Sequence, residues 1–178
     1  MRFHQNTVRT VNILVTSAAG ANGDGYGSIV IFSLDGRALG AFGGDHNITD
    51  PRGLHVHPNG DRVFVNNGDG RILSLDPEGR IVAQTDPIAQ LNPGGGIFGP
   101  HGYYYVGSRS ARTIVAFPPS LLGSGEAILP NGVVPFPRGF AFAPDEIVAF
   151  DFDDGRFLGP VVRMDRLYGQ AIVFFSVC

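Results

Sequence analysis

Hydrophobic residues in this chain fall into many short runs, separated by glycine, proline and charged residues. Four of these runs share one pattern: Ile29-Val30-Ile31-Phe32, Ile72-Leu73-Ser74-Leu75, Ile114-Val115-Ala116-Phe117 and Ile147-Val148-Ala149-Phe150. Each run is short for a helix, and most of its residues are aliphatic or aromatic types that favour strands. The pattern therefore predicts β-strands of one kind that recur along the chain.

A second landmark precedes each of the last three runs. It starts with a Pro-x-Gly tripeptide at Pro51, Pro93 and Pro137, and a second proline follows the first by seven residues. The first prolines are 42 and then 44 residues apart. Two landmarks that recur in phase define a tandem repeat of about forty-two residues.

Each repeat predicts four short strands. An inner strand follows Pro-x-Gly, a second lies at positions such as 63–65, the Ile-rich run is the third, and a weaker fourth lies at positions such as 81–83. A unit of this size cannot bury both of its faces alone, so neighbouring units stack, as in a β-propeller. A β-sandwich or barrel is the alternative, but neither needs phased self-similarity. We therefore predict an all-β chain, a β-propeller of four-stranded blades that forms a single domain over residues 1–178.

The repeat is irregular at both ends. Twenty-one residues separate Pro-x-Gly from the Ile-rich run in two units, but only ten separate Pro137 from Ile147. We expect this unit either to lack its second strand or to be rebuilt from other segments. Near the N-terminus, positions 11–15 match a second strand, so the first inner strand is supplied by residues 1–10 or is absent. The expected blades cover about 11–50, 51–92, 93–136 and 137–166, with a partial blade over 167–178.

About four blades, one of them lacking a strand, predict an incomplete or open ring. Three arrangements follow from this expectation: a piece of a longer protein, an open arc, or a homodimer in which two chains complete the propeller ring. The exposed edge strands of an arc would favour association with another chain.

Charge excludes several partners and chemistries. The chain has 13 basic and 16 acidic residues, a net charge of −3, and lacks the excess positive charge of a nucleic-acid-binding surface. Every basic residue is arginine, which excludes lysine nucleophiles and Schiff bases. The one cysteine, Cys178, allows neither an internal disulfide nor a Cys-x-x-Cys metal site.

The sequence predicts a soluble protein without a membrane partner, since no apolar stretch approaches the length of a membrane span. The compartment stays open between the cytoplasm and export. Arg2 and Arg9 precede a short apolar run and small residues, a faint signal-peptide pattern, but Asn12 interrupts the run and the same segment fits the repeat as a strand.

The best-marked repeat runs from Pro-x-Gly through Pro58-Asn59-Gly60 and an aromatic strand to Arg71-Ile72-Leu73-Ser74-Leu75-Asp76-Pro77-Glu78-Gly79-Arg80. This pattern resembles the NHL-repeat propellers and their relatives, the gluconolactonase-type sugar lactonases and the streptogramin lyases. The likeness spans about Val11 to Gly169. Its prolines and glycines belong to the scaffold, so the resemblance implies a fold more than an activity.

The resemblance implies two classes of function. NHL modules bind other molecules, so one expectation is a binding module with a small-molecule or protein ligand at the channel face. The lactonases hydrolyse sugar lactones with a divalent cation, and the streptogramin lyases open a cyclic ester with a histidine and magnesium. The alternative is therefore a cation-dependent hydrolase or lyase acting on a lactone or cyclic ester. This chain has no tryptophan and lacks the complete metal cluster, which favours the binding module.

Two sets of loops should share the channel face of the propeller. The loops that lead into the inner strands, here called leading loops, are 45–50, 86–92 and 131–138; the loops between second and third strands are 17–27, 66–70 and 107–112. Arg52 and Arg138 occupy the same position of Pro-x-Gly in two blades and could clasp a carboxylate or phosphate together. The alternative is that each arginine makes a salt bridge to a neighbouring blade. Asn92 and Arg109 complete the predicted ligand-binding set.

Oxygen-bearing residues on this face suggest a metal. Lactonase-like propellers often place an Asn or Asp metal ligand after the second strand. Here Asn66 occupies that place and Asp69 is near enough to help, and oxygen ligands of this kind suit calcium or magnesium. The alternative is a tight turn, because Asn and Gly tolerate positive φ. His46, in a leading loop with two aspartates, is the candidate general base. His55 and His57 share one face of an inner strand, where they either form a metal or proton-transfer pair or hydrogen-bond between blades.

Overall fold

The structure, a computed structural model, describes residues 12–18, 26–43, 47–88, 91–99, 102–121 and 125–134, and the backbone of four later strands within 139–174. The described residues fold into four antiparallel sheets, here called blades 1 to 4. They include no helix long and apolar enough to cross a membrane.

Consecutive strands lie side by side in every blade; blade 1 has three described strands and each of the others has four. Blade 1 consists of β1 (Ile13–Ser17), β2 (Ser28–Phe32) and β3 (Ala38–Phe42). Blade 2 consists of β4 (Gly53–Val56), β5 (Val63–Asn66), β6 (Ile72–Leu75) and β7 (Ile81–Gln84). Blade 3 consists of β8 (Pro93–Phe98), β9 (Tyr104–Ser108), β10 (Thr113–Phe117) and β11 (Glu126–Ala127). Blade 4 consists of β12 (Gly139–Ala143), β13 (Glu146–Phe150), β14 (Phe157–Met164) and β15 (Ala171–Phe174).

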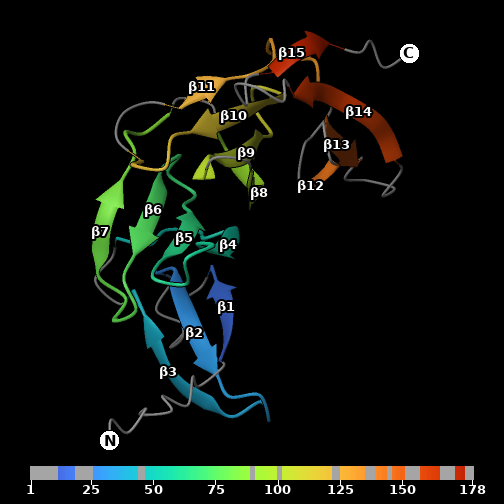
Figure 1. The fold of residues 1–178 in the computed structure, drawn as a ribbon. Helices are drawn as coiled ribbons and strands as arrows, with labels where there is room; N and C mark the ends of the chain where they lie inside the picture. Colours follow the sequence, from blue (N-terminus) through green and yellow to red (C-terminus); the bar gives the residue numbers. More distant parts are fainter. Residues whose placement is uncertain are drawn as a thin grey trace, which may run out of the picture.

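The blades form an open arc around a shared inner side (Figure 1). The inner strand β4 packs against β8, and β8 packs against β12, so consecutive blades meet through their inner strands. Within the described residues the sheets do not close into a ring. The all-β propeller class and the incomplete ring, both predicted from the repeat, are confirmed.

Among the described residues the three-stranded blade is the first one, whereas the unit at 137–166, together with β15, forms a four-stranded sheet. In blade 4 the run at Ile147 is the second strand, because β13 pairs with β12 on one edge and with β14 on the other. Strand β14 takes the third position, and β15 pairs with β14 as the fourth strand of the same sheet, where a further partial blade was expected. Second and third strands both lie inside a sheet with two covered faces, so their apolar runs look alike in sequence.

Blade 2 is buried on both faces. Phe64 packs with residues of blade 3, including Tyr104 and Phe117, whereas its neighbour Val65 packs with Ile29 of blade 1. Successive residues of a strand point to opposite faces, so the adjacent apolar pair Phe64-Val65 contributes to two separate cores. The hydrophobic core of this protein therefore lies between blades.

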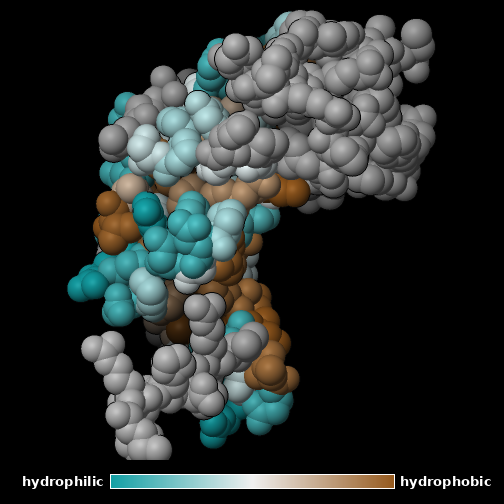
Figure 2. Space-filling view, in the orientation of Figure 1, coloured by the Kyte–Doolittle hydropathy of each residue, from teal (hydrophilic) through white to brown (hydrophobic). Residues whose placement is uncertain are grey.

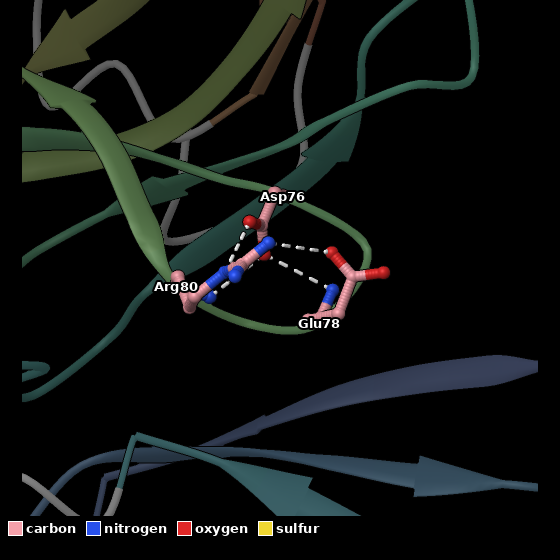
Figure 3. Close-up of polar contacts among 3 residues, drawn as sticks. All are labelled: Asp76, Glu78 and Arg80. Carbon is pink, nitrogen blue, oxygen red and sulfur yellow. Dashed lines mark hydrogen bonds and ion pairs between the residues drawn. The ribbon is translucent and has the colours of Figure 1, made fainter.

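A compact hairpin closes the outer edge of blade 2 (Figure 3). The Asp76 carboxylate accepts hydrogen bonds from the backbone N–H groups of Glu78 and Arg80, at 3.0 and 2.9 Å, and from the Arg80 side chain at 2.7 Å. Gly79 takes a positive φ of 82° there. These exposed ion pairs contribute little stability, but the side chain of Asp76 organises the turn between β6 and β7.

A candidate anion-binding cavity on the channel face

Leading loops and second-to-third-strand loops meet on one face, as the sequence predicted. The N–H of Gly68 donates to the carbonyl of Thr49 at 2.7 Å, and the N–H of Arg109 donates to the carbonyl of Asn92 at 3.3 Å. Each of these bonds joins a leading loop to the loop after a second strand. The two loop sets therefore form a connected surface on which side chains from different blades converge.

A cavity of about 460 Å³ opens on this surface between blades 2 and 3. Its walls come from the end of the leading loop 45–50, the adjoining Arg52, the start of β8 and the residue that follows β9. The lining residues, here called the arginine cavity, are Asp50, Arg52, Pro93, Gly94, Gly95 and Arg109. Two of the predicted ligand-binding residues, Arg52 and Arg109, thus lie at one site.

The guanidinium of Arg52 is held by partners on both sides. Its Nε donates to Oδ2 of Asp50 at 2.8 Å, and its Nη1 donates to Oδ1 of Asn92 at 2.8 Å. Asn92 belongs to the leading loop of the next blade, so Arg52 joins two blades while it lines the cavity. Asn92 therefore holds Arg52 in place, and the direct ligand contact predicted for Asn92 stays a prediction. Arg138, the other half of the predicted clasp, lies outside the described residues.

Formal charge in the arginine cavity is positive. Arg52 and Arg109 contribute two positive charges and Asp50 one negative charge, which leaves a net +1. Asp50 offsets the charge of Arg52, to which it is bonded.

The backbone around the cavity is distorted at three places. Asp50 and Asn92 have positive φ values of 42° and 34°, although neither is glycine and each precedes a proline. In β8, Pro93 pairs with Ser108 and Gly96 with Val106, so two glycines, Gly94 and Gly95, oppose a single residue of β9 and form a bulge. Such distortions cost free energy and concentrate at binding and catalytic sites. Sequence patterns do not reveal these backbone distortions. The only shared sign in the sequence is that Asp50 and Asn92 each precede a proline.

Asn66 joins blades 2 and 3 through both ends of its side-chain amide. Its Nδ2 donates to the carbonyl of Gly94 at 2.7 Å, and its Oδ1 accepts from the Tyr104 hydroxyl at 2.9 Å. Asn66 and Tyr104 are fully buried, and burial raises the pKa of the Tyr104 hydroxyl well above its usual value. Tyr104 therefore stays protonated as a donor, and Asn66 supports the cavity wall at Gly94.

Asn66 and Asp69, the predicted metal ligands, have different partners. Asp69 accepts a hydrogen bond from the backbone N–H of Arg71 at 3.0 Å and lines a second cavity, of about 390 Å³, with Asn92. Neither cavity is lined by both predicted ligands. No cluster of three His, Cys, Asp or Glu side chains that could hold a metal ion occurs in the described part of the chain, and the metal site stays a prediction. His46, the candidate base, lies outside the described residues.

The two inner-strand histidines have different surroundings. Nε2 of His55 accepts a hydrogen bond from the N–H of Gly96 at 3.3 Å, which confirms the inter-blade interpretation of that residue. His57 contacts the ring of Phe98, with centroids 5.1 Å apart, and Nδ1 lies 3.2 Å from the Asp61 carboxylate. The pair therefore contributes to the seam between blades 2 and 3.

Protonation of His55 is expected to weaken this seam. Burial lowers the pKa of His55 below its ordinary value of 6.5, and a protonated Nε2 could not accept from Gly96. The stability that neutral His55 contributes is present above about pH 6.5 and is lost as pH falls through its folded-state pKa. We expect His55→Gln to flatten the decline of Tm with acidification, measured by thermal melts from above pH 6.5 downward. An equal decline in wild type and His55→Gln would contradict the assignment.

Comparison with known proteins identifies the fold. No protein-family model and no curated protein sequence matches the chain. Among solved structures it is similar to a streptogramin B lyase, with 17% identity and a TM-score of 0.56, over 87% of this chain and 56% of that one. It is also similar to a catalytically inactive virginiamycin B lyase of Staphylococcus aureus with quinupristin (14% identity, TM-score 0.61, 84% and 51% coverage). A third similar structure is the hydrazine synthase of Kuenenia stuttgartiensis, with 16% identity and a TM-score of 0.61, over 97% of this chain and 52% of that one.

The chain spans little more than half the length of the structures it matches. At this level of identity the likeness shows a propeller-type fold and nothing about chemistry. The properties of the arginine cavity are therefore the basis for any assignment of function.

Proposed function

We propose that this protein is an NHL-like propeller module that binds a small carboxylate-bearing molecule in the arginine cavity. The observation that carries the proposal is the convergence of Arg52 and Arg109 on one cavity. Guanidinium groups bind carboxylates through directional, charge-assisted hydrogen bonds, which are stronger than neutral ones.

The size and rigidity of the site support a small ligand. A volume of about 460 Å³ lies within the range of small-molecule sites. Arg52 is already held in place by Asp50 and Asn92, so less side-chain entropy is lost when a ligand binds. The bulge at Gly94 and Gly95 brings backbone rather than side chains to the cavity wall, which leaves room for a ligand near both arginines.

Removal of one guanidinium is the direct test. Gluconate, citrate and succinate, each beside an uncharged analogue, would be screened by thermal shift, and the best carboxylate titrated by calorimetry. We expect Arg109→Gln to weaken its binding by about ten- to a hundredfold, the loss expected for a charge-assisted hydrogen bond. Arg62→Gln is the matched control, because Arg62 lies in the hairpin between β4 and β5 and outside the arginine cavity.

The proposal would be overturned if wild type and Arg109→Gln bound the carboxylate with equal affinity. It would also be overturned if the carboxylates raised the Tm of wild type no more than their uncharged analogues do. If a protein bound instead of these probes, and Arg109→Gln abolished that binding, the proposed site would stand but the class of ligand would change.

The cation-dependent hydrolase or lyase requires a different result. Calcium or magnesium would raise the Tm of wild type, and Asp69→Asn would abolish the increase, because a carboxylate ligand contributes charge that an amide lacks. Asp69 suits this test better than Asn66, since its side chain is partly exposed and its replacement leaves the buried seam intact. A Tm independent of either cation would exclude this alternative.

A further inference from the structure

The cavity lined by Asp69 lies on the same face as the arginine cavity. It has a volume of about 390 Å³ and is formed by the loop after β5 and the leading loop 86–92. Its lining includes Asp69, Gly70, Ile88, Leu91 and Asn92, and it is here called the Asp69 cavity. The hydrophobic surface that Figure 2 shows over blade 1, along the open side of the arc, contributes no described residue to either cavity.

Asn92 connects the two cavities. Its backbone carbonyl accepts a hydrogen bond from the N–H of Arg109 at 3.3 Å, and its Oδ1 accepts one from Nη1 of Arg52 at 2.8 Å. Both arginines line the arginine cavity, whereas Asn92 lines the Asp69 cavity. The two cavities are therefore neighbours, and one elongated small molecule can occupy both.

The wall that the leading loop 86–92 contributes to the Asp69 cavity is apolar and held in place. Leu91 belongs to the core between blades 2 and 3, and Ile88 packs against the same core. The N–H of Ile88 donates to the carbonyl of Gly70 at 3.2 Å. Gly70 has a φ of 89°, and a Cβ there would lie 2.8 Å from the Ile88 carbonyl oxygen, so this approach of the two loops requires glycine. A fixed apolar wall suits the methylene groups of a ligand.

Asp69 gives the same cavity a negatively charged acceptor. Its Oδ1 accepts a hydrogen bond from the backbone N–H of Arg71 at 3.0 Å. Its Oδ2 lies 3.7 Å from Nη1 of Arg71, which is beyond hydrogen-bond distance, and the Asp69 side chain is 35% exposed. Within the described residues Oδ2 therefore accepts no hydrogen bond. A carboxylate oxygen in this condition favours a positively charged donor.

We infer that the ligand of this protein is a small amino carboxylate whose carboxylate binds in the arginine cavity and whose ammonium group pairs with Asp69. The methylene groups between these two ends lie along Ile88. The inference rests on the proposed function, because that proposal places a carboxylate beside Arg52 and Arg109. Charge fixes the orientation, since the reverse placement brings the ammonium to the arginines and the carboxylate to Asp69.

Matched pairs of ligands test the ammonium contact. Wild type would be titrated by calorimetry with γ-aminobutyrate, δ-aminovalerate and ε-aminocaproate, each beside the hydroxy acid of the same length. A chelating resin removes divalent cations from the buffer, which excludes binding through a metal. For the best length we expect the amino acid to bind about three- to fivefold more tightly than its hydroxy acid, as for a partly exposed ion pair.

Three variants assign the two ends of the ligand. Asp69→Asn keeps the acceptor for the Arg71 N–H and removes the charge, so it is expected to abolish the gain from the ammonium and leave hydroxy-acid affinity unchanged. Asp86→Asn is the matched control and is expected to retain the gain, because Asp86 is exposed in the same leading loop and is not a described lining residue of the Asp69 cavity. Arg109→Gln is expected to weaken both members of a pair by the same factor, because it removes a partner of the carboxylate.

The outcomes separate this inference from the proposed function. If hydroxy acids bind and the amino acids bind no more tightly, or if the gain persists in Asp69→Asn, the inference is overturned and the proposed function stands. If no acid of either series binds wild type, both are overturned. If Asp69→Asn fails to fold by circular dichroism, Asp69→Ser replaces it, since a serine hydroxyl also accepts from the N–H two residues later.

Discussion

Asn66→Ala is expected to lower the free energy of unfolding by about 3 kcal/mol, because two buried groups lose their hydrogen-bond partner at once. The Gly94 carbonyl loses its donor and the Tyr104 hydroxyl its acceptor, and Tyr104 is fully buried, which leaves no access to water. For a domain of this size the loss corresponds to a decrease in Tm of about 6–12 °C.

Two further variants separate the contributions of the Asn66 Nδ2 and Oδ1 atoms to this loss of stability. Tyr104→Phe removes one donor and is expected to cost about half as much as Asn66→Ala. Asn66→Asp keeps the acceptor for Tyr104 but loses the donor to Gly94 and buries a carboxylate, so it should destabilise at least as strongly as alanine. Urea denaturation at neutral pH measures all three. A change within about 0.5 kcal/mol for Asn66→Ala, the range of ordinary surface substitutions, would show that the seam does not depend on this amide.

Asn66 also connects stability to the proposed site. Gly94, whose carbonyl it holds, lines the arginine cavity. We therefore expect substitutions of Asn66 to alter the affinity of the arginine cavity for its ligand, although Asn66 does not line that cavity. For the same reason, Asn66 variants are unsuitable as tests of metal binding.

Phe64→Ala is expected to cost about 4 kcal/mol, in the range measured for removal of a buried aromatic side chain. Phe64 has no exposed surface and lies at the centre of the contact between blades 2 and 3. Its ring centroid lies 4.9 Å from that of Phe98, 5.2 Å from that of Tyr104 and 5.8 Å from that of His57. Alanine would leave a cavity and remove all three ring contacts.

Phe64→Leu separates the loss of volume from the loss of ring contacts. It keeps much of the apolar volume and is expected to cost about 1–2 kcal/mol, while Leu34→Ala, at an exposed position, should stay within about 0.5 kcal/mol of wild type. Urea denaturation followed by tyrosine fluorescence and by circular dichroism measures the change. If Phe64→Ala unfolds in two separate transitions, blades 2 and 3 fold as separate units. If Phe64→Ala lowers the free energy of unfolding by less than Phe64→Leu does, the core does not lie at this contact.

The sequence determined the repeat, the four blades and the face on which the loops meet. Apolar runs recur with Pro-x-Gly in phase because each blade must present the same two faces to its neighbours, so residues such as Phe64 and Val65 are both apolar. The same rule placed Arg52 and Arg109 on one face from their loops alone, since turns at one end of a blade lie together.

The tertiary structure alone decided which position the run at Ile147 takes in its blade and how the site is built. The run at Ile147 suits a second or a third strand equally, and only pairing with β12 and β14 decides between them. Likewise the turn motif that follows β5 does not show that the Asn66 amide bonds with Gly94 and Tyr104, 28 and 38 residues away. Local patterns specify which face a residue occupies, whereas hydrogen bonds between blades depend on how separate repeats pack, which periodicity does not encode.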